Sequence, residues 1–179
     1  MDGAVIASAN AAPLTLGCNT RASDCFILLS YLEQGIVWDR RDFPLEARNG
    51  FFISLSLQEG GGPLGGDFSY VRVLPEVRGY VTAAKRVTFA GRLRLGELYP
   101  WSAESAVVTR FFAGGGVSMR GFSERRLSPL LIAPAPATTL SAPGTLTLPI
   151  GGNGLFEANF EMRFRLSTNL VFAVFMDLG

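Results

Sequence analysis

Apolar and polar residues alternate without a break along residues 154–166, GLFEANFEMRFRL. Successive side chains of a β-strand point to opposite faces, so this pattern predicts a strand with one apolar and one charged face. The apolar positions are Phe156, Ala158, Phe160, Met162, Phe164 and Leu166, and the polar positions are Glu157, Asn159, Glu161, Arg163 and Arg165. We therefore expect a strand that separates an apolar medium from water.

Five further stretches fit strands, which brings the predicted number to about six. They cover residues 26–43, 51–58, 67–81, 86–96 and 169–179. The first is less regular, and the last is apolar almost throughout and ends close to Asp177. Pro75 falls on the apolar side of its stretch and has no N–H to donate, so we expect an irregularity in the pairing there.

The connections between these strands alternate in length along the chain. Residues 46–50, 82–85 and 166–169 are short turn signals, whereas the connections at 59–67 and 101–153 are long and rich in glycine or proline. Short turns on one side and long loops on the other are typical of outer-membrane barrels. A soluble β-sandwich also has alternating strands, but Glu, Arg and Asn on neighbouring polar faces favour a water-filled lumen. The expected fold class is all-β, an antiparallel transmembrane β-barrel.

Composition supports this class and argues against others. Charged residues make up 17% of the chain, below the ~25% of a usual soluble domain. No apolar run approaches the ~18–20 residues of a membrane-spanning helix. A net charge of +1 with scattered basic residues argues against nucleic-acid binding. The sequence has no histidine, so we expect no metal site, no cofactor and no enzymatic activity.

Cys18 and Cys25 are the two cysteines of the sequence, in CNTRASDC. Their spacing suits a small disulfide-closed loop in an oxidising compartment and is too wide for a CxxC motif. Two free thiols remain the alternative, since sequence cannot establish the pairing. Residues 1–12 lack the basic and continuous apolar regions of a signal peptide.

Residues 110–129, RFFAGGGVSMRGFSERRLSP, combine three consecutive glycines with an isolated arginine. Taken alone, the glycines fit a flexible loop and the arginine a solvated charge. A phosphate-binding loop is less plausible, because no GK[ST] follows the glycines. The flanking residues decide between these interpretations.

RFFAGGGVSMRGF, PIGGNGLFEANFEMRF and VFMDLG together resemble the C-terminal barrel of the BamA/TamA/Sam family, also called bacterial surface antigens. WDRRDFPLEARNGFF is similar to that family's Arg-Asp-x-Pro strand end and periplasmic turn, and GGPLGGDFSY to its next hairpin. The resemblance covers roughly residues 28–179. It implies a barrel of about sixteen strands in the bacterial outer membrane that inserts or exports other proteins.

The resemblance also assigns roles to individual residues. In this family a long extracellular loop folds back into the lumen, where its motif arginine meets acids of the inner wall. The motif falls on Arg120, Gly121 and Phe122, the acids on Glu161 and Asp177, and the preceding loop glycines on Gly114, Gly115 and Gly116. Glycine permits backbone angles and close approaches that would let the loop turn inward. A guanidinium can fork to carboxylates, which a lysine does poorly.

The implied organisation is one partial barrel domain over residues 1–179. It comprises a loop segment at 1–26, strands and hairpins at 27–98, the long inward-folding loop at 101–153 and two further strands at 154–179. Six strands do not enclose a lumen as eight or more do, so we expect a piece of a longer product, with assembly from several chains as the alternative.

The implied partners are the outer-membrane lipid bilayer and client outer-membrane or secreted proteins, with accessory assembly subunits left open. Barrel assembly, autotransporter assistance and two-partner secretion also stay open as functions. The alternative function is a passive porin or adhesin, which would have no reason to couple Arg120 to Glu161 and Asp177.

Overall fold

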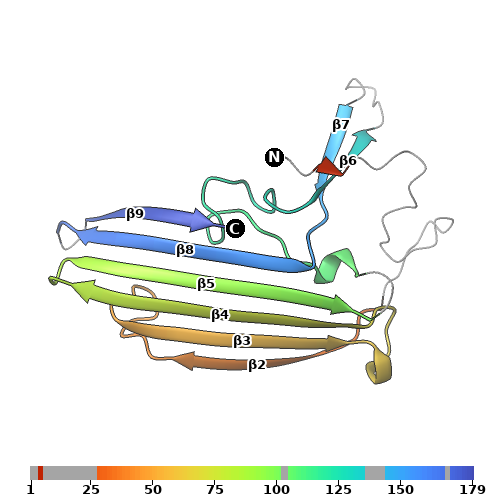
Figure 1. Cartoon of the computed structure of the whole chain (residues 1–179), viewed down its shortest axis with the longest axis horizontal. Helices are drawn as coiled ribbons and strands as arrows, with labels where there is room; N and C mark the ends of the chain where they lie inside the picture. The colour runs from red at the N-terminus through yellow and green to blue at the C-terminus, as the bar shows by residue number, and fades with distance from the viewer. Residues whose placement is uncertain (1–3, 6–27, 102–104, 136–143, 168–169) are drawn as a thin grey trace.

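A computed structural model describes residues 4–5, 28–101, 105–135, 144–167 and 170–179. Six long strands form one antiparallel sheet in the order β2-β3-β4-β5-β8-β9 (Figure 1). The strands are β2 (Tyr31–Asp39), β3 (Gly50–Gly60), β4 (Tyr70–Ala83), β5 (Val87–Pro100), β8 (Gly154–Arg165) and β9 (Val171–Leu178). The expected all-β, antiparallel class is confirmed. Within the described ranges, no helix has the length and apolarity needed to cross a membrane.

The predicted irregularity at Pro75 is a gap in the pairing of β4 with β5. Val73 pairs with Glu97 and Glu76 pairs with Arg94, while Leu74 and Pro75 have no partner on β5. The register is the same on both sides of the gap. The strand therefore tolerates the missing N–H without a bulge.

The two faces of the sheet differ in chemistry, as the alternation predicted. One face exposes large apolar side chains on all six strands, a surface far larger than soluble monomers normally leave in contact with water. Among them are Ile36, Trp38, Ile53, Leu55, Val77, Val81, Leu93, Leu95, Phe156, Phe160, Phe172, Val174 and Met176. The other face carries charged residues joined by ion pairs across β4, β5, β8 and β9. We call these the outer face and the inner face.

The connections fall at two ends of the sheet (Figure 1). Those after β2, β4 and β8 lie at one end, and those after β3 and β5 lie at the other. One length differs from expectation, because β2 ends at Asp39 and its connection to β3 runs over residues 40–49. The Asp42 carboxylate orders this loop by accepting hydrogen bonds from the backbone N–H groups of Phe43, Arg48 and Asn49.

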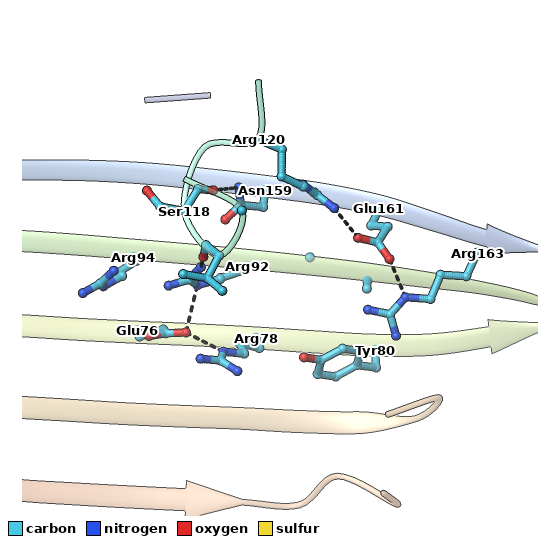
Figure 2. A pocket seen from close by; sticks show the side chains of 14 residues that line it. Glu76, Arg78, Tyr80, Arg92, Arg94, Ser118, Arg120, Asn159, Glu161 and Arg163 are labelled. Carbon is cyan, nitrogen blue, oxygen red and sulfur yellow. Dashed lines mark hydrogen bonds and ion pairs between the residues drawn. The ribbon is translucent and has the colours of Figure 1, made fainter. Parts of the chain in front are cut away.

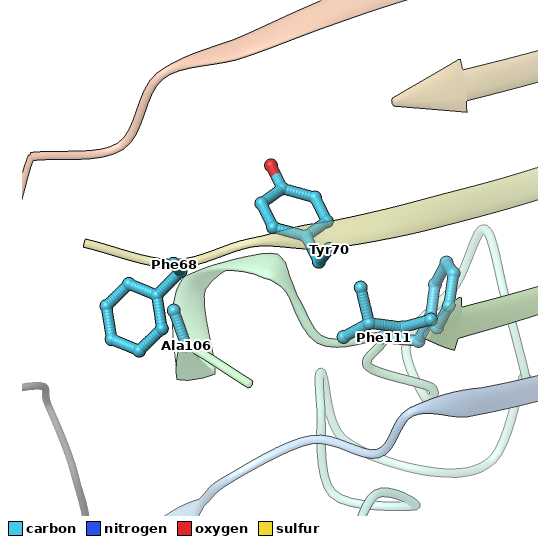
Figure 3. Close-up of a cluster of buried hydrophobic side chains, with 5 residues drawn as sticks. Phe68, Tyr70, Ala106 and Phe111 are labelled. Carbon is cyan, nitrogen blue, oxygen red and sulfur yellow. The ribbon is translucent and has the colours of Figure 1, made fainter. Parts of the chain in front are cut away.

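The buried apolar core is small and lies on the inner face, at the end opposite the β2–β3 connection. It contains Phe68, Tyr70, Leu98, Ala106 and Phe111 (Figure 3). Ala106 and Phe111 belong to the long segment between β5 and β8, so this cluster packs the start of that segment against the sheet. The core thus serves to attach a loop to the inner face.

A second, smaller sheet was not predicted. Strands β6 (Leu130–Ala135) and β7 (Gly144–Pro149) form an antiparallel hairpin within the expected loop 101–153, and β1 (Ala4–Val5) pairs with β6 inside the expected loop 1–26. The hairpin stands away from the large sheet (Figure 1). Its sequence is rich in proline, and that composition favours loop over strand when local signals are weighed. Two short 3-10 turns complete the fold, η1 (Gly62–Leu64) and η2 (Val107–Thr109).

Candidate functional site

Part of the long connection folds onto the inner face of the sheet. Residues 111–127 form a compact turn in which the Gly115 N–H donates to the Phe122 carbonyl oxygen and the Leu127 N–H to the Ala113 carbonyl oxygen, at 3.1 and 3.2 Å. This turn, which we call the lumen loop, lies above β5 and β8 (Figure 2). It carries the arginine that the sequence singled out.

The lumen loop needs two of its three consecutive glycines. Gly114 and Gly115 have φ angles of +108° and +100°, a region that favours glycine. A Cβ at Gly114 would also lie 2.5 Å from the Ser123 carbonyl oxygen. Gly116 differs from the expectation, because its φ is not in that region and a Cβ there would meet nothing within 4 Å.

Arg120 reaches down from the lumen loop to carboxylates on two neighbouring strands. Its Nε and Nη2 donate to the two oxygens of Asp177 on β9, at 3.0 and 2.8 Å, and its Nη1 donates to Glu161 on β8 at 2.6 Å. The guanidinium carbon lies 3.7 Å from the centre of the Phe175 ring. Hydrogen bonds to Asp177, followed by those to Glu161, raise the pKa of Arg120 above its ordinary value, so this side chain stays charged.

We call the contact of Arg120 with Glu161 and Asp177 the Arg120 tether. Each of its two acids has a second partner. The Asn159 side-chain amide donates to Asp177 at 2.9 Å. Arg163 Nε donates to Glu161 at 2.6 Å (Figure 2). The side chains of Asp177 and Glu161 are 5% and 20% exposed. A carboxylate with little contact to water is stable only with charge-assisted hydrogen bonds of this kind. These bonds also hold the two acids in position. Sequence reasoning had not assigned Asn159 and Arg163, although both share the inward parity of Glu161.

The other two motif residues behave differently from Arg120. Gly121 has a φ of +96°, which lets the chain turn directly after the arginine. Phe122 is about half exposed, at 51%, and no aromatic or cation–π contact is found for it within the described chain. The structure therefore brings Arg120, Glu161 and Asp177 together and leaves the Phe122 ring outside this cluster.

At the end of the inner face that lies away from the buried core, the β2–β3 connection reaches across to β8. Glu46 forms an ion pair with Arg165, and Arg163 Nη1 donates to the Ala47 carbonyl oxygen at 3.5 Å. Thr82 on β4 donates to the Arg48 carbonyl oxygen at 2.9 Å. Arg163 thus contacts both this connection and a carboxylate of the tether.

A groove of about 580 Å³ lies between the lumen loop and the sheet. Charged and polar side chains in its walls include Glu76, Arg78, Arg92, Arg94, Arg120, Asn159, Glu161 and Arg163. Such a wall suits a water-filled lumen. Cys18 and Cys25 lie outside the described residues, so their pairing stays a prediction.

An open antiparallel sheet with an apolar outer face, a charged inner face and an inward-folded loop defines a segment of a transmembrane β-barrel wall. Residues 11–179 match the model of the Omp85 superfamily domain, and the chain belongs to this superfamily. It is also similar to the outer membrane protein assembly factor BamA of Nitratidesulfovibrio vulgaris, with 37% identity over 71 residues. That match covers 39% of this chain and 9% of the relative. Family and fold place the chain in the bacterial outer membrane.

Proposed function

We propose that this chain forms part of the barrel of an outer-membrane machine that inserts other proteins into the outer membrane or exports them across it. The observation that carries the proposal is the three-way contact of Arg120 with Glu161 and Asp177. It holds a long loop inside the lumen by residues of two different strands. The family membership and the relative's name, an assembly factor, support the same role.

A passive pore or adhesin gives this tether less to do. Its loops need only leave a channel open or present a surface to the outside. A machine that handles client proteins must instead keep the loop in its lumen ordered while the strands of its wall change their pairing partners. A forked, poorly hydrated ion pair attaches the loop in one defined direction. Within this proposal the chain is not an enzyme, and the bonds of its clients remain unchanged.

The test uses the full-length gene product in its own outer membrane. Arg120→Ala should lower the amounts of several unrelated outer-membrane proteins while the variant itself stays folded. The matched control is Arg126→Ala, which removes an exposed arginine of the same loop whose Nη1 donates to the Thr147 carbonyl oxygen at 3.4 Å. If Arg120→Ala changes only small-solute permeability or surface adhesion and leaves client levels intact, the passive alternative replaces the proposal.

A further inference from the structure

Glu157 is a fully buried carboxylate that the Arg120 tether does not use. It lies on the inner face of β8, and its side chain is 0% exposed. Arg94 Nη1 donates to it at 3.2 Å, and Arg92 Nη2 lies 3.8 Å away. An ionised carboxylate without water is strongly unfavourable unless it is well paired, so its remaining partner is informative.

That partner comes from the lumen loop. The Ser118 hydroxyl donates to Glu157. The same hydroxyl oxygen accepts the Gly114 N–H at 3.1 Å, and this bond directs the hydroxyl proton toward the carboxylate. Ser118 is itself 8% exposed. The loop therefore completes the coordination of a buried charge on the sheet.

Two further bonds fix the same point of the loop. Arg92 Nη1 donates to the Val117 carbonyl oxygen at 2.6 Å, and Asn159 donates to the Ser118 carbonyl oxygen at 2.9 Å. Arg92 is held in turn by Glu76 on β4, with 2.9 Å between Nε and the carboxylate. Residues 117–118 are thus attached to β5 and β8, whereas Arg120 is attached to β8 and β9.

We propose that Val117 and Ser118 form a second anchor of the lumen loop, centred on Glu157, which holds the loop in addition to the Arg120 tether; Asn159 donates a hydrogen bond to each of the two. Met119, which is buried at 4% exposed, lies between the two anchors in the sequence. Separation of β8 from β9 would leave the loop attached to β5 and β8.

The test measures protection of the lumen loop in the full-length protein in its own membrane. Arg125 and Arg126 are exposed in this loop, so the initial rate of trypsin cleavage after them reports how often the loop leaves the sheet. Ser118→Ala should raise that rate about tenfold, the change expected from losing a hydrogen bond to a charged group. Ser123→Ala, the same change at an exposed loop position, is the matched control and should leave the rate unchanged.

Combinations of substitutions separate an anchor from a general loss of structure. Glu157→Gln should also raise the rate, because it removes the charge of the group that accepts the Ser118 hydroxyl, and Ser118→Ala should then add less to the rate than it does alone. Ser118→Ala combined with Arg120→Ala should multiply the two single effects. Ser118→Thr, which retains the hydroxyl, should restore protection.

Three results would overturn the second anchor. The first is a Ser118→Ala rate equal to that of Ser123→Ala. The second is full multiplication of the Ser118 and Glu157 effects, which would mean that these residues do not interact. The third is a single Arg120→Ala rate as high as that of the combined variant. Heat-modifiable gel migration of each variant shows that its barrel has folded. Client assembly plays no part in the cleavage readout, so this test stays valid if the proposed function fails.

Discussion

The carboxylate of Asp177 accepts three hydrogen bonds from Arg120, two from the guanidinium and one from the backbone N–H at 2.9 Å. Side-chain and main-chain attachment therefore converge on one acid at the end of β9. A substitution at Arg120 removes only the first kind. A substitution at Asp177 removes both, which makes the acid the more sensitive member of the pair.

Arg120→Ala should destabilise the docked lumen loop by about 2–3 kcal/mol, between the values for exposed and fully buried pairs, because the Arg120 side chain is 26% exposed. Arg120→Lys should recover only part of this, since an ammonium keeps the charge but cannot fork to two carboxylates. Hydrogen exchange of residues 111–127 in the full-length protein measures both effects. Equal protection in the Lys variant and the unsubstituted protein would show that charge alone is sufficient.

Asp177→Asn should destabilise the docked loop more than Glu161→Gln does. Asp177 accepts the Arg120 backbone N–H and two guanidinium hydrogen bonds, whereas Glu161 accepts one guanidinium hydrogen bond from Arg120. Neutralising either acid leaves charge on Arg120 partly uncompensated. The same exchange experiment ranks the two variants, and a larger effect at Glu161 would contradict the importance of the backbone bond.

Asp42→Ala should loosen the β2–β3 connection, because three backbone N–H groups lose their acceptor. Hydrogen bonds from Arg48 and then Asn49 hold the pKa of Asp42 below its ordinary value. A carboxyl with a lowered folded-state pKa stabilises the loop above its unfolded-state value of ~3.9, and that contribution disappears as pH falls through the lower folded-state value. Exchange rates of residues 43–49, corrected for intrinsic pH dependence, should therefore rise on acidification in the unsubstituted protein but not in the variant.

The two ends of the sheet should lie on opposite sides of the outer membrane. In a background without Cys18 and Cys25, a membrane-impermeant thiol reagent applied to whole cells should label Leu64→Cys and spare Arg86→Cys. Both residues are exposed and lie in connections at opposite ends of the sheet. Labelling of Arg86→Cys alone would reverse the orientation, and Arg86→Cys in lysed cells serves as the reactivity control.

Cys18 and Cys25 should form an intrachain disulfide in the oxidised envelope. The loop that they close is short, so its contribution to stability should lie at the low end of the ~2–4 kcal/mol range. Mass spectrometry of the alkylated, non-reduced protein checks the pairing. Recovery of two alkylated cysteines would refute it.

Strand parity, the alternation of side chains between the two faces of a strand, was the sequence signal that predicted most of the candidate site. It places Glu161 on the inner face from the sequence alone, and it applies equally to Asn159 and Arg163, which donate hydrogen bonds to the two acids that hold Arg120. Parity could not show that Glu157 is buried more deeply than Glu161, because its partner Ser118 belongs to a loop distant in sequence. The β6–β7 hairpin could not be predicted from the sequence for a related reason: each of its strands is short, and pairing between them rather than local propensity makes them strands.

Direct pairing of β5 with β8 has a consequence for the order of folding. The ladder brings together the two ends of the long connection, and the entropy of closing that connection grows only slowly with its length. Once the ladder exists, docking of residues 111–127 is a local search by a chain already held at both ends. Glu157 would then keep its water until this last step, so the dehydration of one carboxylate should coincide with the ordering of the lumen.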